Sequence, residues 1–152
     1  MGYTTNPLCQ VAGTTFITRR FGHRPKSRFR LSSERDPMAL SLADVNLANL
    51  DKVQAELNNQ YQEVHTEIFA VDVTKMADIY ASLQSAASKF GRIDISIQGA
   101  RITGFPAAMH GFSLEDWQPV IDINLAGLAL HTHEVNYMAV VGLTNLDTST
   151  RR

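Results

Sequence analysis

Residues 38–74 read MALSLADVNLANLDKVQAELNNQYQEVHTEIFAVDVT, and this stretch decides the fold. It begins with a short apolar run at 38–43 and ends with another at 68–71, each of the length of a buried strand. Asn46 is a residue type that caps helices, and after it apolar residues recur at helical spacing, at Leu47, Leu50, Val53, Leu57 and Tyr61. The stretch therefore predicts a strand–helix–strand unit, the connection that joins parallel strands in one sheet.

Strands and helices keep alternating on both sides of this stretch. Upstream, residues 14–18 (TTFIT) are β-branched and aromatic, which predicts a strand. Downstream, Thr74 predicts the start of a second helix and Gly91 its end, because glycine is common just past a helix C-terminus. The apolar stripe predicted for this helix consists of Met76, Ile79, Tyr80, Leu83, Ala87 and Phe90.

A fourth strand and a third helix complete the pattern. Residues 93–97 predict the strand, and Ser113 with Asp116 three positions later forms a capping-box pattern that starts a helix reaching Val135. The positions expected to line its inner face are Leu114, Trp117, Ile121, Leu125 and Leu128. The predicted fold is α/β: a partial doubly wound, Rossmann-like parallel sheet with strand order 3-2-1-4, truncated after the fourth strand and its following helix.

The composition fits one folded domain. The chain has 152 residues and is 44% hydrophobic, which is enough for a single core. No apolar run reaches the ~18–20 residues of a membrane helix, and the first residues lack a signal-peptide pattern. Cys9 is the one cysteine, so a disulfide framework is excluded and an inert thiol is expected. We predict a cytoplasmic protein without membrane contact, with a partial dinucleotide-binding domain at 1–135 and an irregular tail at 136–152.

The net charge of −1 hides one basic segment. Residues 19–33, RRFGHRPKSRFRLSS, hold six of the fourteen Lys and Arg residues and no acid. Gly22 and Pro25 break regular structure, so this segment is a poor helix for joining the first two strands. Phe21 and Phe29 are too few stacking platforms for us to expect a nucleic-acid partner.

Beyond the single elements, residues 38–124 resemble the short-chain dehydrogenase/reductase family. The resemblance rests on four segments: ALSLADVN at 39–46, AVDVT at 70–74, KFGRIDISI at 89–97 and SLEDWQPVIDINLAGLAL at 113–130. It implies a Rossmann-like fold and hydride transfer between the nicotinamide of NAD(P) and a carbonyl or alcohol substrate.

The resemblance also implies a set of site residues. Asp44 ends a strand where NAD-preferring members hold the adenosine ribose; a carboxylate there accepts from the ribose diol and repels a 2′-phosphate, so NAD is expected over NADP. Asp72 and Val73 fall near the adenine, and Ala100 lies in the turn that flanks the cofactor. Asn124 matches the family's structural and catalytic Asn, which supports a water that links the catalytic Lys to solvent. Taken alone, the two acids also fit caps or turns, and Asn124 fits an exposed helix face.

Two departures from the family affect the cofactor loop. Thr18 is followed by Arg19 and Arg20 where the family has its Gly-rich phosphate loop, and arginine cannot rebuild a turn that needs glycine. At residues 98–101 the sequence reads QGAR instead of Asn-Asn-Ala-Gly, so only Ala100 matches. A one-base shift of a degenerate coding sequence turns residues 19–33 into GGSGIGRSLAFALAA, the missing loop and helix, so our hypothesis is a frame-shifted segment.

The third departure concerns catalysis. The family's Ser and Tyr-x-x-x-Lys have no counterpart, since Tyr61 and Tyr137 are followed at that spacing by His65 and Val141. We therefore expect impaired cofactor binding and a truncated, inactive form of an oxidoreductase, with a non-catalytic remnant or interaction module as the alternative. In the family the third helix lies at a subunit interface, so self-association through Ser113–Val135, with its apolar face partly exposed, is expected.

A metal site is not expected. His131 and His133 are two positions apart on the third predicted helix, so their side chains point to different faces.

Overall fold

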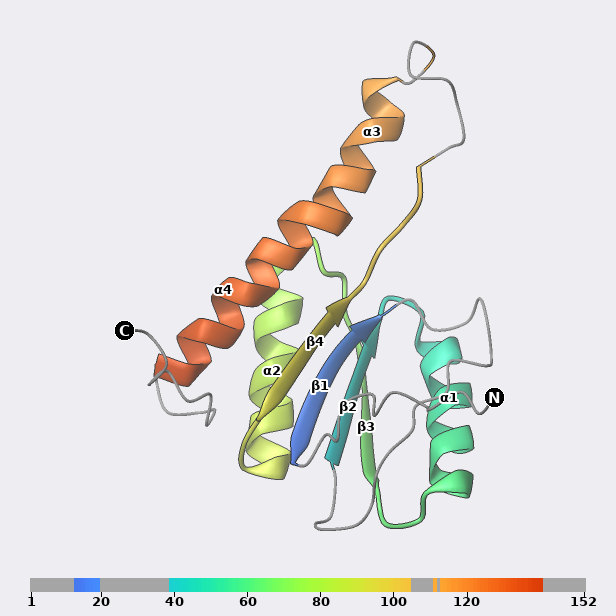
Figure 1. The fold of residues 1–152 in the computed structure, drawn as a ribbon, viewed down its shortest axis with the longest axis vertical. Coiled ribbons are helices and arrows are strands. Elements are labelled where there is room, and N and C mark those ends of the chain that lie inside the picture. Colours follow the sequence, from blue (N-terminus) through green and yellow to red (C-terminus); the bar gives the residue numbers. More distant parts are fainter. Residues whose placement is uncertain (1–12, 20–38, 105–110, 112, 141–152) are drawn as a thin grey trace, which may run out of the picture.

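The computed structural model describes residues 13–19, 39–104, 111 and 113–140. These residues form one four-stranded sheet with helices on both faces (Figure 1). The strands are β1 (Thr14–Arg19), β2 (Ala39–Asp44), β3 (His65–Ala70) and β4 (Ile95–Gly99). The helices are α1 (Leu47–Gln60), α2 (Met76–Phe90), α3 (Leu114–Ile121), the π-helical turn η2 (Asp122–Ala126) and α4 (Gly127–Val140).

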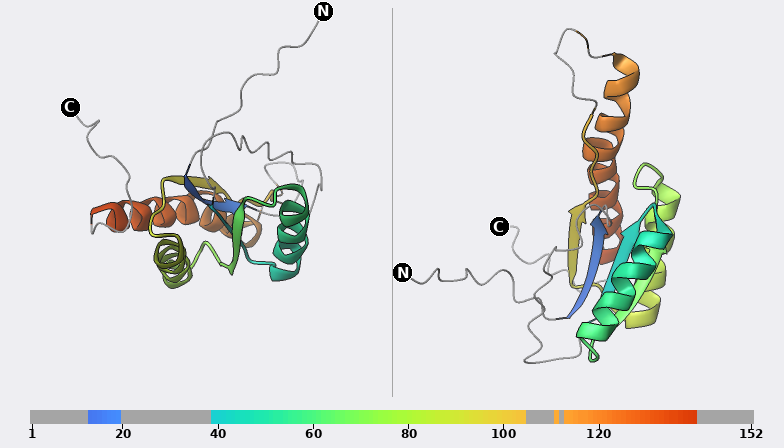
Figure 2. Two further views of the ribbon diagram at one scale, coloured as in Figure 1. Left: turned by 90° about the horizontal axis from the view of Figure 1, so that it is seen from below. Right: turned by 90° about the vertical axis from the view of Figure 1, so that its right-hand side faces the viewer.

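The sheet confirms the predicted topology. Its strand order is β3-β2-β1-β4 and every pair is parallel. The chain crosses from β2 to β3 through α1 on one face and from β3 to β4 through α2 on the other (Figure 2). The order reverses direction beside β1, so β1 and β4 border the crevice where doubly wound sheets bind ligands.

Each face of the sheet has its own apolar core. On the face of α2 and α4, Phe16 and Ile79 are fully buried together with Met138 of α4. On the face of α1, Leu42 and Leu50 are fully buried. Alternate residues of β1 and β2 enter the two cores, which is why both strands are buried on both faces. The two central strands, β1 and β2, are therefore covered on both sides.

Helix starts follow the predicted caps in two of three cases. Asn46 Oδ1 accepts from the Asn49 backbone N–H (3.2 Å), and Ser113 Oγ accepts from the Asp116 N–H (3.1 Å). The second helix, in contrast, begins at Met76 instead of Thr74, because Thr74 is held by Asp72 in a turn. It ends at Gly91 as predicted, where φ is +78°.

Three further expectations need correction. β3 is an edge strand with partly exposed side chains, so the apolar run at 68–71 does not mark a strand buried on both faces. The third helix continues to Val140, five residues into the predicted irregular tail, because Met138 is buried against Phe16 and Ile79. Its predicted inner face is largely outward, because Leu114, Trp117, Leu125 and Leu128 are exposed; the expectation of a partly exposed apolar face is thereby confirmed.

The basic segment at 19–33 lies outside the described residues except for Arg19, which extends β1 by one residue. The hypothesis of a frame-shifted segment stays a prediction.

Candidate functional site

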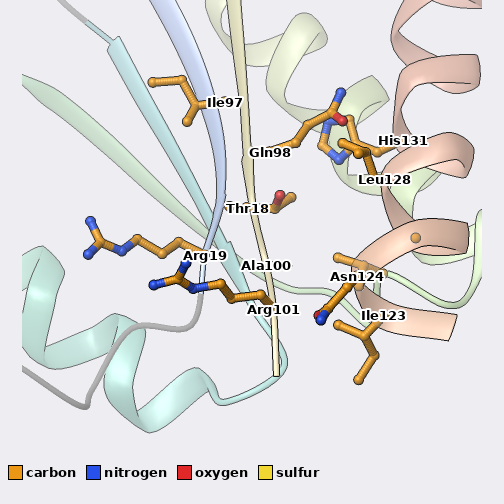
Figure 3. A pocket seen from close by; sticks show the side chains of 13 residues that line it. Thr18, Arg19, Ile97, Gln98, Ala100, Arg101, Ile123, Asn124, Leu128 and His131 are labelled. Carbon is orange, nitrogen blue, oxygen red and sulfur yellow. The ribbon is translucent and has the colours of Figure 1, made fainter. Parts of the chain in front are cut away.

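A pocket of about 520 Å³ opens at the carboxyl ends of β1 and β4. This volume lies within the range of about 300–1,000 Å³ typical of small-molecule sites. Figure 3 shows its walls, which come from the two strand ends and from the helix that runs past them. The residues that line it are Thr18, Arg19, Val73, Ile97, Gln98, Gly99, Ala100, Arg101, Ile123, Asn124, Gly127, Leu128 and His131.

Three of the five predicted site residues line this pocket: Val73, Ala100 and Asn124. Asp44 and Asp72 do not line it, although both lie at the same edge of the sheet, after β2 and β3. The carboxyl ends of parallel strands share one edge, which is what brings these distant residues together.

Asp44 is the last residue of β2 and is 6% exposed. Its Oδ1 accepts from the Asn46 backbone N–H (3.0 Å), so the carboxylate caps the turn that leads into α1. Its backbone oxygen accepts from the Val71 N–H (3.0 Å), which fixes the end of β2 against β3.

Asp72 is occupied locally. Its Oδ1 accepts from the Thr74 hydroxyl (2.7 Å) and the Thr74 N–H (3.0 Å), and Lys75 Nζ lies 3.5 Å from its Oδ2. The Thr74 hydroxyl, more than any other group, holds the pKa of Asp72 below its ordinary value. These contacts give Asp72 a role in the turn after β3, which is the alternative that the sequence left open.

Val73 fixes how closely α4 approaches the sheet edge. A Cβ added at Gly127 would lie 3.0 Å from both Val73 Cγ2 and the Val73 backbone oxygen. The helix can therefore pass this point because residue 127 has no side chain.

Asn124 lies in η2, where the helix widens to a π turn. Its Oδ1 accepts from the Ile102 N–H and its Nδ2 donates to the Ile102 carbonyl, both at 2.9 Å. The amide thus pairs with both backbone groups of one residue beyond β4. This contact holds the segment after β4, including Ala100 and Arg101, against the helix.

His131 was not predicted as a pocket residue. It is 1% exposed, its Nε2 lies 3.0 Å from Ser96 Oγ, and its ring meets Phe16 edge-on at 5.6 Å between centroids. Nδ1 is buried and has no hydrogen-bond partner among the described residues. Burial lowers the pKa of His131 to about 4.

The sequence did carry a signal for His131. It follows Asn124 by seven residues, two helical turns, so it lies on the same side of the helix. Within the described residues, no group of three His, Cys, Asp or Glu side chains could hold a metal ion.

No described helix is both long and apolar enough to cross a membrane.

A family model described as short chain dehydrogenase matches residues 33–141. One relative is a 2-dehydro-3-deoxy-L-rhamnonate dehydrogenase (NAD(+)) of Sphingomonas sp. (strain SKA58), 36% identical over 97 residues that cover 64% of this chain and 36% of that protein. Another is glucose 1-dehydrogenase 2 of Bacillus subtilis (strain 168), 42% identical over 39% of this chain and 23% of that protein. The chain thus spans about a third or less of the length of these two relatives.

Solved structures share the fold. Levodione reductase superposes with a TM-score of 0.69 and 24% identity, covering 82% of this chain and 48% of that one. NAD⁺-bound xylitol dehydrogenase superposes with a TM-score of 0.64 and 24% identity, covering 68% and 39%.

Proposed function

This chain belongs to the short-chain dehydrogenase family, and we propose that it is the nicotinamide-dinucleotide-binding part of an oxidoreductase that prefers NAD to NADP. The observation that carries the proposal is Asp44, a nearly buried carboxylate at the end of β2, one strand away from the pocket at β1 and β4. A carboxylate at this place accepts hydrogen bonds from a ribose diol and repels a phosphate on the 2′-oxygen.

Part of the site fits such a cofactor and part does not. Gly99 supports the fit. A Cβ at this residue would lie 3.2 Å from the Thr18 carbonyl oxygen, so glycine allows the ends of β1 and β4 to lie close together and adds no side chain to the pocket wall. Arg19 opposes it, because it stands where close backbone approach to phosphate requires glycine. We therefore propose binding weaker than is usual for a complete Gly-rich loop.

The described residues have distinct tasks in this proposal. Asp44 holds the adenosine ribose, Val73 and Ala100 form walls, and Asn124 positions the segment after β4 through Ile102. Asp72 acts by keeping the turn after β3 in shape. When bound, the nicotinamide supplies hydride chemistry, with a small carbonyl or alcohol compound as substrate.

We further propose that the 152-residue chain binds cofactor without turning it over. The family's Tyr and Lys deliver a proton to the developing alkoxide, and residues 1–152 offer no pair at that spacing. General acid–base help of this kind is typically worth about 10²–10⁴ in rate. An NADH-consumption assay with carbonyl substrates is expected to show no activity above the buffer control, and turnover would contradict this part.

The cofactor preference is tested by calorimetric titration with NAD⁺ and NADP⁺. We expect NAD⁺ to bind more tightly, and Asp44→Asn to weaken NAD⁺ about tenfold or more, since hydrogen bonds to charged groups contribute about 1.5–3 kcal/mol. The amide retains an oxygen for the Asn46 N–H, so the turn into α1 is kept.

The matched control is Asp51→Asn, which removes the same charge from the exposed surface of α1. It is expected to leave both affinities unchanged. Equal affinity of the unmutated chain for the two cofactors would contradict the ribose role of Asp44.

A further inference from the structure

Two arginines lie at the mouth of the pocket. Arg19 is the last residue of β1 and pairs in register with Gly99 of β4, while Arg101 follows Gly99 by two residues. Extended residues two apart project to the same side of a strand. Figure 3 shows the two guanidinium groups on one side of the strand ends, directed away from Asn124.

Both arginines are exposed and line the pocket. Neither forms a salt bridge with a carboxylate of the described residues. The pocket lining contains these two cations and no Asp or Glu. Two guanidinium groups that line one pocket without a carboxylate in its lining favour an anion as the ligand.

The position of Asp44 on the neighbouring strand indicates which class of anion the two arginines bind. Thr18 pairs in register with Ala43, so Arg19 comes next to Asp44 in the row of strand ends. Along the sheet edge the order is Asp44 on β2, Arg19 on β1 and Arg101 beyond β4. A ribose joined to a diphosphate presents its diol and its negative charges in the same order.

We propose that Arg19 and Arg101 form a diphosphate-binding pair that acts in place of the Gly-rich loop. This inference rests on the proposed function, because the diphosphate is that of the dinucleotide whose ribose Asp44 holds. Guanidinium groups bind phosphate oxygens with paired, charge-assisted hydrogen bonds and do not need close backbone approach. Arg19 and Arg101 both stand where the family has glycine. In this proposal the positive charge of Arg101 compensates for the loss of the loop glycine at position 19.

A charge-based site has a recognisable signature. Its affinity falls with added salt and depends on the guanidinium shape, whereas binding by backbone amides depends on neither side chain. The probes are ADP-ribose, which carries the diphosphate, adenosine, which lacks it, and inorganic pyrophosphate. Each is titrated calorimetrically into the full 152-residue chain at low and high salt.

We expect ADP-ribose to bind more tightly than adenosine, and the difference to shrink at high salt. Arg19→Gln and Arg101→Gln are each expected to weaken ADP-ribose about tenfold and to leave adenosine unchanged. Arg→Lys at either position is expected to restore part of the loss. Arg92→Gln is the matched control, because it removes another exposed charge, which pairs with Asp94 outside the pocket.

Several results overturn the inference. They are ADP-ribose binding no tighter than adenosine, unchanged ADP-ribose affinity in both Gln variants, or an equal loss with Arg92→Gln. If NAD⁺ binds with the same affinity to both Gln variants as to the unmutated chain, the proposed function stands and the diphosphate-binding role of the two arginines is contradicted. If inorganic pyrophosphate binds through both arginines but NAD⁺ does not bind, the anion site is supported and the proposed function is contradicted.

Discussion

His131 places a titratable ring where the structure favours its neutral form. The ring is 1% exposed between Phe16 of β1 and Ser96 of β4, and burial lowers its pKa from 6.5 to about 4. Glu134 on the same helix is also buried, but its carboxylate contacts His133. Protonation of His131 would therefore place a positive charge in the buried contact between α4 and the sheet.

The consequence is a loss of stability on acidification. Between about pH 6.5 and pH 4 the unfolded chain binds a proton at this residue and the folded chain does not, so the free energy of unfolding falls as the pH is lowered through this window. The full effect is about 3 kcal/mol, on the basis of about 1.4 kcal/mol per pH unit. It is measured by urea unfolding at pH 7.5 and pH 4.

His131→Leu is expected to lower stability at neutral pH through the lost Ser96 contact, while its stability depends less on pH than that of the unmutated chain. His65→Gln, at an exposed position at the start of β3, is the control and is expected to keep the unmutated pH dependence. An unchanged pH dependence in His131→Leu would show that other groups cause the acid sensitivity.

The approach of α4 to the sheet edge depends on one glycine. Alanine at residue 127 would bring a Cβ to 3.0 Å from the Val73 backbone oxygen, which cannot rotate away as a side chain can. In an exposed helix, Gly→Ala stabilises by about 1 kcal/mol. Here we expect Gly127→Ala to lower the free energy of unfolding instead, by about 1–3 kcal/mol, as in other overpacked contacts.

Chemical unfolding of Gly127→Ala measures this effect. The reverse change at an exposed position of the same helix, Ala129→Gly, reports the propensity of α4 alone and is expected to destabilise by about 1 kcal/mol. A Gly127→Ala variant more stable than the unmutated chain would contradict the steric argument.

Most of the elements could be predicted from the sequence because both cores draw on local patterns. Leu50 and Leu57 follow helical spacing in α1, and β1 and β2 place apolar residues in both cores because both of their faces are covered. The edge position of β3 could not be read in this way, since an apolar run such as IFAV does not tell how many neighbours a strand has.

The site was predictable where it follows strand ends and less so where it depends on the helix. Asn124 was predicted from the family resemblance, and the structure gives it two hydrogen bonds to Ile102 from a π turn. The turn itself was not predicted, although Pro119 removes a helical donor one turn earlier. The proximity of Arg19 and Arg101 depends on strand register, which only the assembled sheet provides.

At the scale of the whole molecule, the long helix leaves apolar side chains outside both cores. Leu114 is 81% exposed, Leu125 59% and Leu128 45%, and Trp117 is 43% exposed near the helix start. These four residues, here called the exposed stripe, extend along α3, η2 and α4 (Figure 1). Single exposed apolar residues are common, but contiguous ones mark surfaces that associate.

We predict that the 152-residue chain self-associates through the exposed stripe. Leu125→Lys places a charge at the middle of the stripe without touching either core, so it is expected to shift the chain toward monomer while the unfolding free energy stays within about 0.5 kcal/mol. Sedimentation velocity over a range of protein concentrations measures the shift. Leu47→Lys is the matched control, because Leu47 is a 46% exposed leucine at the start of α1, away from the stripe. A monomer at every concentration would contradict the prediction, and an equal effect of both substitutions would show that association depends on surface charge and not on this helix.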